Sequence, residues 1–390
     1  MGKPEIRFKG YTDEWEQRKL GDLVDRVTRK NQDLVSELPL TISAQYGLID
    51  QNEFFDKRVA SKDVSGYYLI ENGEFAYNKS TSTDAPWGAI KRLDRYENGV
   101  LSTLYIVFGI KENNPVDSDF LVSYYNTNLW HKGIHEIAAE GARNHGLLNI
   151  APADFFETKL MIPQDIEEQK KIGKYFEELE RLITLHQRKC DEVKSLKKYM
   201  LQKMFPQNEQ KVPEIRFEGF TEAWEQRKLG DVAQEFKSGN SLKADEIDIT
   251  GDYPVYGGNG LRGYTSTYNH DGEYALIGRQ GALCGNMNYS AGKAYFTEHA
   301  VVVKADENNV TKFLYYMLDT MNLGQYSDQS AQPGLAVNKL VKLENSFPKK
   351  EEQQQIGAYF RSLDHLITLH QQKCEELKKI KKFMLQKMFV

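Results

Sequence analysis

The chain of 390 residues is poor in cysteine, with three in all: Cys190, Cys284 and Cys374. Three cysteines cannot form a disulfide framework, and so few fit a reducing compartment. The sequence also lacks any run of about 18 apolar residues, which excludes a membrane-spanning helix, and its first residues carry no apolar stretch typical of a signal peptide. A cytoplasmic protein with no membrane contact is therefore expected.

Motifs that mark common enzyme sites are missing as well. The sequence has no GxxxxGK[ST] phosphate loop, no HExxH or GxSxG motif, and no (N/D)PP(Y/F) motif of amino-methyltransferases. Residues 258–263, GNGLRG, match GxGxxG, but no helical period follows them, and a dinucleotide or S-adenosylmethionine site needs a helix N-terminus there. A tight loop is expected instead. We expect no catalytic residue, cofactor or metal in this chain.

The composition itself is ordinary, with 40% hydrophobic and 27% charged residues. A chain of this length can form two or three domains, each with its own core. The net charge of −5 argues only mildly against nucleic acid, because a basic face can lie on a protein that is acidic overall.

The most informative feature is an internal duplication. PEIRFKGYTDEWEQRKLGDLV, residues 4–24, returns as PEIRFEGFTEAWEQRKLGDVA at residues 213–233, an offset of 209. A second block, residues 167–205, returns at residues 351–389 with an offset of 184, and LITLHQ, KC and MLQKMF are identical in both copies. The sequences between the blocks show little obvious similarity. Random sequence drift after a duplication would change all parts to a similar extent, but here the repeated blocks match and the inserts differ. This pattern indicates one scaffold that carries two domains with different binding specificities.

Each second block predicts one long helix, with acidic residues at its start and lysines at its end, as the helix dipole favours. A helix of about 40 residues spans roughly 60 Å, which is too long for one small domain. Two such helices are expected to pair as an antiparallel coiled coil and to relate the halves by a pseudo-twofold axis. The heptad seam that predicts this pairing consists of Ile172, Phe176, Leu179, Ile183, His186, Cys190 and Val193, and of Ile356, Phe360, Leu363, Ile367, His370, Cys374 and Leu377.

This seam allows a zinc site as an alternative to core packing. His186 and Cys190 are four residues apart, as are His370 and Cys374, so two helices could offer a His2Cys2 ligand set. An antiparallel pair brings these positions together only where the two sequence centres coincide, and both residue types are common in helix seams. Core packing is the preferred interpretation.

The chain resembles the specificity subunits of type I restriction–modification enzymes over nearly its whole length. In the scaffold the resemblance rests on WEQRKLGD after PEIRF and on the helix that runs from EEQ to MLQKMF, each present twice. In the inserts it rests on YPVYGGNGLRGY, ALIGRQGALCG and SAQPGLAVNKL in the second half, and on FAYNKSTSTDAPWGAIKRLDRYENGVLSTLYIVF in the first. Together these segments are specific, whereas any one alone would be weak.

The resemblance implies both a fold and a function. Two α/β (α+β) target-recognition domains with largely antiparallel strands would alternate with the helices, and each would read one half of a bipartite, asymmetric target in double-stranded DNA. The helices would set the gap between the half-sites and dock two modification (methyltransferase) subunits. The chain would be no enzyme by itself. Its partner subunits would hold S-adenosylmethionine for adenine methylation, and ATP and magnesium for the restriction subunits that translocate and cut DNA.

The expected boundaries are a recognition domain at 1–162, a helix at 163–205, a linker at 206–212, a second recognition domain at 213–347 and a second helix at 348–390. Two other functions remain open. A self-contained DNA methyltransferase or nuclease with diverged motifs would act without partners. A coiled-coil protein adaptor would show no salt-dependent affinity for DNA.

Base reading needs Arg, Lys, Asn or Gln at base edges, with basic and hydroxyl side chains on phosphates. In the first domain the candidates are a polar run after FAY and then a glycine-flanked loop: Asn78, Lys79, Ser80, Thr81 and Ser82, then Arg143 and Asn144. In the second domain they form three groups: Asn259, Arg262 and Tyr264; Arg279 and Gln280; Gln329, Ser330 and Gln332.

The last group precedes its helix as the Arg143 loop precedes its own, which is the main argument for both loops. Each group could instead be a solvated turn, because Gly, Asn and Ser dominate turns. Trp15 and Trp224 recur in the scaffold and are expected to pack in a core.

Overall fold

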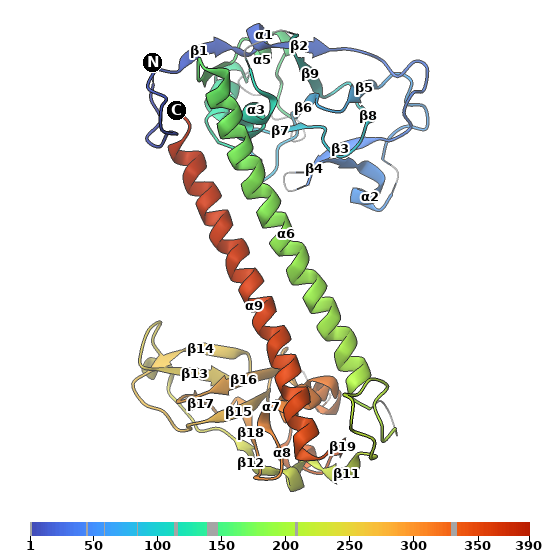
Figure 1. The fold of residues 1–390 in the computed structure, drawn as a ribbon, viewed down its shortest axis with the longest axis vertical. Coiled ribbons are helices and arrows are strands. Elements are labelled where there is room, and N and C mark those ends of the chain that lie inside the picture. The colour runs from blue at the N-terminus through green and yellow to red at the C-terminus, as the bar shows by residue number, and fades with distance from the viewer. Residues whose placement is uncertain are drawn as a thin grey trace. The chain divides into compact units, whose positions relative to one another are not determined.

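The computed structural model describes residues 2–43, 46–57, 59–83, 85–112, 116–138, 147–206, 210–328 and 334–390. The chain divides into two compact units: unit 1 comprises residues 1–185 and 373–390, and unit 2 comprises residues 186–372. Each unit therefore combines one globular domain with one half of helix α6 (Ile166–Met204) and one half of helix α9 (Lys350–Lys387) (Figure 1). None of the helices in the described ranges is long and apolar enough to cross a membrane.

Both domains contain a four-stranded antiparallel sheet with the same strand order. In unit 1 the order is β2 (Val24–Val27), β9 (Ile106–Ile110), β6 (Phe75–Asn78) and β7 (Ala89–Arg92). In unit 2 it is β12 (Ala233–Ser238), β18 (Ala300–Ala305), β15 (Glu273–Gly278) and β16 (Met287–Ala291). The two inserts, whose sequences look unrelated, thus share a core fold.

The register shows where the two halves diverge in length. Phe75 pairs with Phe108, and at the same place in the other sheet Ala275 pairs with Val303. The offset between equivalent residues is therefore 209 at the entry block, 200 at Phe75, 195 at Phe108 and 184 in the long helices. The difference in length is spread over several loops of the inserts.

Each domain adds strands of its own to this shared sheet. Unit 1 adds two strand pairs and a short helix: β3 (Leu40–Ser43) with β4 (Gly47–Asp50), β5 (Tyr68–Glu71) with β8 (Asn98–Leu101), and α2 (Gln51–Phe55). Unit 2 adds a three-stranded sheet of β14 (Gly260–Thr265), β13 (Tyr253–Gly257) and β17 (Tyr295–Phe296). The two domains therefore share one central sheet and differ in the strands that surround it.

A strand pair joins each entry block to the residues just before its long helix. In unit 1 β1 (Glu16–Lys19) pairs with β10 (Lys159–Ile162), and in unit 2 β11 (Glu225–Lys228) pairs with β19 (Glu344–Phe347). The remaining helices of unit 1 are α1 (Leu20–Leu23), α3 (Ser118–Tyr125), α4 (Trp130–Ile137) and α5 (Pro152–Phe156). Those of unit 2 are α7 (Thr311–Thr320), α8 (Val337–Leu340) and the 3-10 turns η1 (Leu229–Val232), η2 (Ala244–Glu246) and η3 (Leu323–Tyr326).

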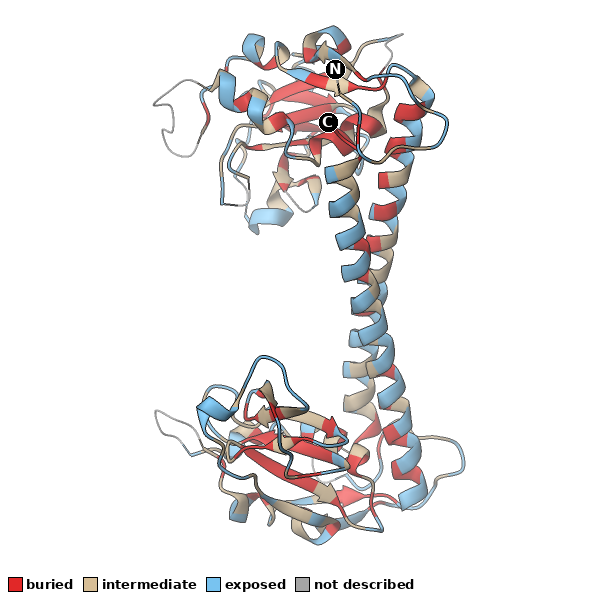
Figure 2. Ribbon diagram, turned by 90° about the vertical axis from the view of Figure 1, so that its left-hand side faces the viewer, coloured by how far each residue is buried: buried red, intermediate tan, exposed pale blue. Residues whose placement is uncertain are grey.

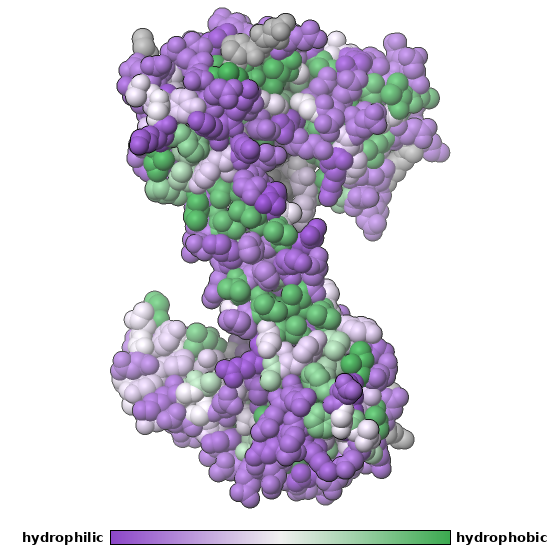
Figure 3. Space-filling view, in the orientation of Figure 1, coloured by the Kyte–Doolittle hydropathy of each residue, from purple (hydrophilic) through white to green (hydrophobic). Residues whose placement is uncertain are grey.

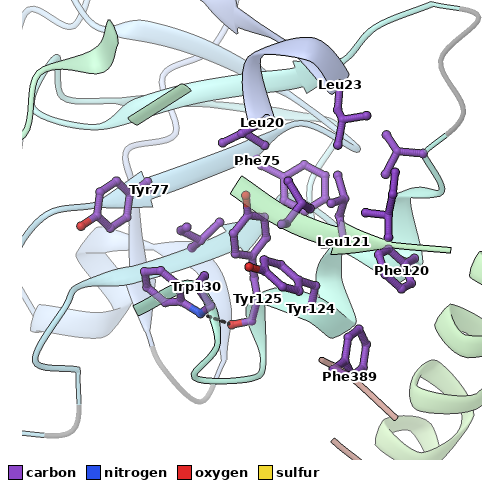
Figure 4. Close-up of a cluster of buried hydrophobic side chains, with 14 of the residues drawn as sticks. Leu20, Leu23, Phe75, Tyr77, Phe120, Leu121, Tyr124, Tyr125, Trp130 and Phe389 are labelled. Carbon is purple, nitrogen blue, oxygen red and sulfur yellow. Dashed lines mark hydrogen bonds between the residues drawn. The ribbon is translucent and has the colours of Figure 1, made fainter. Parts of the chain in front are cut away.

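Helix α3 packs in a core that also receives the end of α9. Figure 4 shows Phe389 close to Phe120 and Tyr124, below Phe75 and Leu20. The Phe389 ring lies 5.5 Å from that of Phe120 and 6.0 Å from that of Trp15, which is 1% exposed. In unit 2 Trp224, 2% exposed, holds the equivalent place beside Phe205 at the end of α6. The expectation that both tryptophans pack in cores is confirmed.

The two helices run antiparallel in each unit. In unit 1 the rings of Phe176 and Phe389 lie 5.8 Å apart, and in unit 2 those of Phe205 and Phe360 lie 5.9 Å apart. The predicted seam is buried or half-buried throughout, and Figure 2 shows buried residues where the two helices face each other. The predicted fold class, with mixed α/β domains and an antiparallel helix pair, is confirmed.

The centres of the two helix sequences coincide. His186 Nδ1 lies 3.0 Å from His370 Nδ1. The thiols, however, face backbone carbonyls: Cys190 Sγ lies 4.0 Å from the oxygen of Ile367, and Cys374 Sγ lies 3.9 Å from that of Ile183. Within the described ranges no three His, Cys, Asp or Glu side chains gather in a way that could hold a metal.

A buried ion pair explains why PEIRF and EEQ are repeated together. Arg7 Nε and Nη2 donate to the two carboxylate oxygens of Glu168 at 2.5 and 2.7 Å. In unit 2 Arg216 makes the same fork with Glu352 at 2.6 and 2.7 Å. Both glutamates are at most 1% exposed. The entry block is thus fastened to the start of the long helix in each unit.

The glutamine that follows each of these glutamates holds the domain to the same helix. Gln169 Oε1 accepts a hydrogen bond of 2.8 Å from the backbone of Asp117, the N-cap of α3. Gln353 Oε1 accepts one of 2.9 Å from the backbone of Val310, the N-cap of α7. Each long helix is therefore bonded to its globular domain through side chains of the repeated motif.

Candidate nucleic-acid interface

In unit 1 the polar run after β6 pairs with the residues that follow the second candidate segment in the chain. Ser80, which follows β6, forms a β-bridge with Leu147, and the backbone N–H of Leu148 donates to the carbonyl of Lys79 at 3.0 Å. Leu147 directly follows the loop that carries Arg143 and Asn144, although these two residues lie outside the described ones. The polar run after β6 thus adjoins the end of the second candidate loop.

The same pairing occurs in unit 2. Gln280, which follows β15, forms a β-bridge with Gly334, and the backbone N–H of Leu335 donates to the carbonyl of Arg279 at 2.9 Å. The three candidates of the loop before Gly334 lie outside the described residues: Gln329, Ser330 and Gln332. The residues that directly follow the two candidate loops, Leu147–Leu148 and Gly334–Leu335, therefore pair with equivalent segments of the shared sheet.

Hydrogen bonds within the domain hold several side chains of the first-domain candidates. Asn78 Oδ1 accepts from the backbone of Ser80 at 3.0 Å, and Lys79 Nζ lies 3.5 Å from the carbonyl of Ile150. Burial lowers the pKa of Lys79. Ser80 and Ser82 are exposed, and Thr81 is half-buried. Ser82 Oγ accepts from the backbone of Ala85 at 3.1 Å, and Asn78 shapes the turn.

In unit 2 a histidine that sequence reasoning missed joins Arg279 and Gln280. The backbone of Arg279 donates to the carbonyl of His299 at 2.9 Å, and His299 Nδ1 lies 3.1 Å from Gln280 Oε1. Glu298 is beside it, 3.5 Å from His299 Nε2. A signal existed in the sequence, because a polar Thr-Glu-His run directly precedes the apolar strand β18.

The glycine-rich segment forms the turn between β13 and β14, as expected, and no helix follows it. A Cβ on Gly278 would lie 2.5 Å from the oxygen of Gly258, and a Cβ on Gly258 would lie 2.8 Å from that of His299. Only glycine allows this approach. The exposed Asn259 is thereby held beside the Arg279 segment.

The two remaining candidates of this hairpin lie on β14. Arg262 is exposed, and its Cδ lies next to Gly257, beside the turn. Tyr264 is half-buried, and its backbone exchanges two hydrogen bonds of 2.9 Å with Asp248. The structure thus gathers Asn259, Arg262, Arg279 and Gln280 in one region and places Tyr264 farther along the hairpin.

A buried cluster fixes β17, which pairs with β13 of this hairpin. The amide of Asn269 exchanges hydrogen bonds of 3.0 and 2.9 Å with the backbone of Phe296 on β17. The ring of His270 stacks on Phe296 at 4.7 Å, and its Nε2 lies 2.8 Å from a carboxylate oxygen of Glu235. Burial alone would raise the pKa of Glu235, but hydrogen bonds from His270 and Lys237 outweigh burial and lower it.

We expect Glu235→Gln to lower the free energy of unfolding by about 1–2 kcal/mol at pH 7, because a charged acceptor is lost. A carboxyl whose pKa is lowered in the folded state stabilises the protein above its ordinary pKa, and this contribution is lost as the pH falls through the lowered value. Urea denaturation of both proteins at pH 7 and at steps down to pH 3.5 measures the difference, which should shrink only below about pH 4.5. A difference that stays constant with pH would contradict this role.

Comparison with known proteins adds the family. The family model of the type I restriction modification DNA specificity domain matches residues 12–195 and 221–379. The EcoprrI type I specificity subunit of Escherichia coli is 51% identical over 114 residues, which cover 29% of this chain and 28% of that protein. A putative type I specificity subunit of Haemophilus influenzae is 26% identical over 142 residues, or 36% of each chain. The chain thus aligns with about a third of the length of these curated relatives.

The fold has a close counterpart among solved structures. The S subunit of a type I restriction-modification system from M. genitalium superposes with a TM-score of 0.71 at 17% identity, covering 100% of this chain and 99% of that one. At this identity the likeness concerns the fold. The resemblance read from the repeated motifs is confirmed, since the family model matches both halves of the duplication. The chain therefore belongs to the family of type I restriction–modification DNA specificity domains and carries two of them.

Proposed function

We propose that this chain is the specificity subunit of a type I restriction–modification complex and that each domain reads one half of a bipartite target in double-stranded DNA. One observation carries this proposal. The same place in the shared sheet presents Lys79 and Ser80 in one domain and Arg279 and Gln280 in the other, each paired to the end of a second candidate loop. Arg and Gln suit guanine and adenine edges, whereas Lys and Ser suit phosphates and single acceptors. The two half-sites should therefore differ.

The other candidates extend these two surfaces. In unit 1 they are Asn78, Thr81 and Ser82, with Arg143 and Asn144 on the adjoining loop. In unit 2 they are Asn259, Arg262, Tyr264 and His299, with Gln329, Ser330 and Gln332 on the adjoining loop. The exposed Asn259 and Arg262 belong to the hairpin whose Gly258 approaches Arg279, and they have the strongest claim.

Apolar patches on the helices support the proposal of two modification subunits as partners. In unit 2 Leu196 and Tyr199 on α6 are 44% and 51% exposed, and each pair of residues three apart shares one helix face. At the offset of 184, unit 1 presents Ile380 and Phe383 on α9, 36% and 51% exposed. Figure 3 shows apolar surface over the helices in both units. Grouped exposed apolar side chains mark protein interfaces, and two equivalent patches fit two copies of one partner.

In this assembly each kind of subunit would have its own role. The modification subunits would bind S-adenosylmethionine and methylate adenine, and the restriction subunits would use ATP and magnesium. The long helices would set the gap between the half-sites. A self-contained methyltransferase or nuclease would instead modify or cut DNA as a purified chain, and an adaptor would show no salt-dependent affinity for DNA.

A domain exchange tests the proposal. Residues 25–150 are replaced by the corresponding segment of another family member, and methylated adenines are mapped in DNA from cells that express the chimera with its modification subunit. Only one half of the methylated motif should change, because unit 2 keeps its own sheet and loops. The reciprocal exchange of residues 234–335 is the matched control and should change only the other half. A change in both halves after a single exchange would contradict the assignment of one half-site to each domain.

A further inference from the structure

A hollow of about 510 Å³ in unit 1 lies between the end of α9 and the connection from α3 to α4. Its apolar lining includes Ile183, Leu385 and Phe389, and Lys378, Lys381 and Lys382 surround this lining. Successive helical residues are about 100° apart, so Lys378, Lys382 and Leu385 face roughly away from Ile380 and Phe383. The hollow is thus a surface separate from the apolar patch assigned to a modification subunit.

The other unit fills the equivalent place with an aromatic ring. At the offset of 184, Glu180 and Lys381, which line the hollow, correspond to Asp364 and Lys197. Tyr316 donates to Asp364 at 2.6 Å, and Lys197 Nζ lies 5.3 Å from the centre of the tyrosine ring.

Helix α3 of unit 1 has no aromatic side chain at the equivalent position. Phe120 and Phe313 are equivalent, since each lies 5.8 Å from its scaffold tryptophan, Trp15 or Trp224. Counting three residues onward from each phenylalanine places Ser123 where unit 2 has Tyr316. A serine has no ring to place between the domain and the helices.

The hollow in unit 1 and the equivalent place in unit 2 also differ in their charged residues. Asn126 lines the hollow at the position of Asp319, so unit 1 has one carboxylate fewer. Lys91 Nζ donates to Asn126 Oδ1 at 2.9 Å, which adds an ammonium group beside a neutral amide. Burial lowers the pKa of Lys91, and the charge of Lys381 lowers it further. Glu180, which pairs with Lys381, is the carboxylate that lines the hollow.

We propose that this hollow binds an acidic peptide segment of a partner protein, which lays an aromatic or aliphatic side chain on the apolar lining and places a carboxylate among the lysines. The missing ring explains the apolar half of this specificity, and the missing carboxylate explains the charged half. The apolar lining distinguishes the hollow from a phosphate-binding surface of the kind that DNA requires.

A labelled peptide tests the proposal on the full chain. The probe is a fluorescein-labelled helical dodecamer that carries glutamate on one face and phenylalanine and leucine on the other, and fluorescence anisotropy follows its binding. Lys378→Glu/Lys382→Glu should weaken binding about tenfold or more. The matched control, Lys194→Glu/Lys198→Glu, makes the same charge change at the equivalent positions of unit 2 and should have less than a twofold effect. Leu129→Asp, on the exposed rim of the hollow, should weaken binding without removing a lysine.

The results of these measurements distinguish an acidic peptide from DNA as the ligand of the hollow. Saturable binding that is lost in the unit 1 variants and kept in the unit 2 control supports the proposal. If both double variants lost peptide affinity equally, the loss would come from the net charge of the chain, and the proposal would be wrong. The proposal would also be wrong if the peptide showed no saturable binding. Full competition by a duplex of unrelated sequence would assign the hollow to DNA instead. All four proteins are compared by thermal unfolding, and Leu129→Asp provides the result if a lysine variant does not fold.

Discussion

Replacing Arg216 by methionine is expected to lower the free energy of unfolding by about 3–5 kcal/mol, because Glu352 would stay in the core without a partner. Arg216 makes both hydrogen bonds to this carboxylate, which is 1% exposed. Urea denaturation followed by tryptophan fluorescence measures the loss, since Trp224 lies in the core of the same unit.

The double variant Arg216→Met/Glu352→Met is the control for this result. It removes both charges, so most of the lost stability should return. Arg7→Met repeats the test in unit 1, where Arg7 makes the same fork with Glu168. A loss below about 1 kcal/mol for Arg216→Met would show that the ion pair of Arg216 with Glu352 does not hold the repeated PEIRF and EEQ motifs together.

Arg279→Ala/Gln280→Ala is expected to weaken binding of the assembled complex to its target duplex by about 10- to 1000-fold, because one or two base-edge contacts are each worth about 1–3 kcal/mol. Binding to a duplex of unrelated sequence should fall much less. Competition binding at a fixed salt concentration measures both affinities, since salt alone shifts each of them.

Lys293→Ala is the matched control, because it also removes one positive charge from the surface of unit 2. Lys293 follows the end of β16 opposite to the recognition loops, and its ammonium lies over the ring of Tyr268 at 4.7 Å. It should leave the ratio of specific to non-specific binding unchanged. If Arg279→Ala/Gln280→Ala weakened binding to both duplexes equally, these residues would contact phosphates and the bases would be read elsewhere.

The features that the sequence predicted are those encoded over short distances along the chain. The seam from Ile172 to Val193 and its copy follow from a heptad period, and the glycine turn before Asn259 follows from neighbouring residues. These features can be predicted without knowing which distant segments of the chain are in contact.

The features that it did not predict depend on contacts between distant segments. The common sheet rests on pairs such as Phe75 with Phe108 and Ala275 with Val303, which no local pattern reveals once the residue types have diverged. The place of His299 beside Gln280 follows from strand register. The hollow is formed by side chains from three distant segments of unit 1, residues 126–129, 180–183 and 378–389. Each of the two units also draws on both long helices.

The insertion of Phe389 into the core of the N-terminal domain sets an order for folding during synthesis. Unit 2 is one continuous stretch of chain, residues 186–372, so all of it is synthesised before residues 373–390. Unit 1 needs residues 373–390 to cover Trp15 and Phe120, and these residues leave the ribosome after the whole of unit 2. Although domains commonly fold from the N-terminus onward, the domain that is synthesised first here is completed last, and until then it exposes an apolar face that a chaperone can bind.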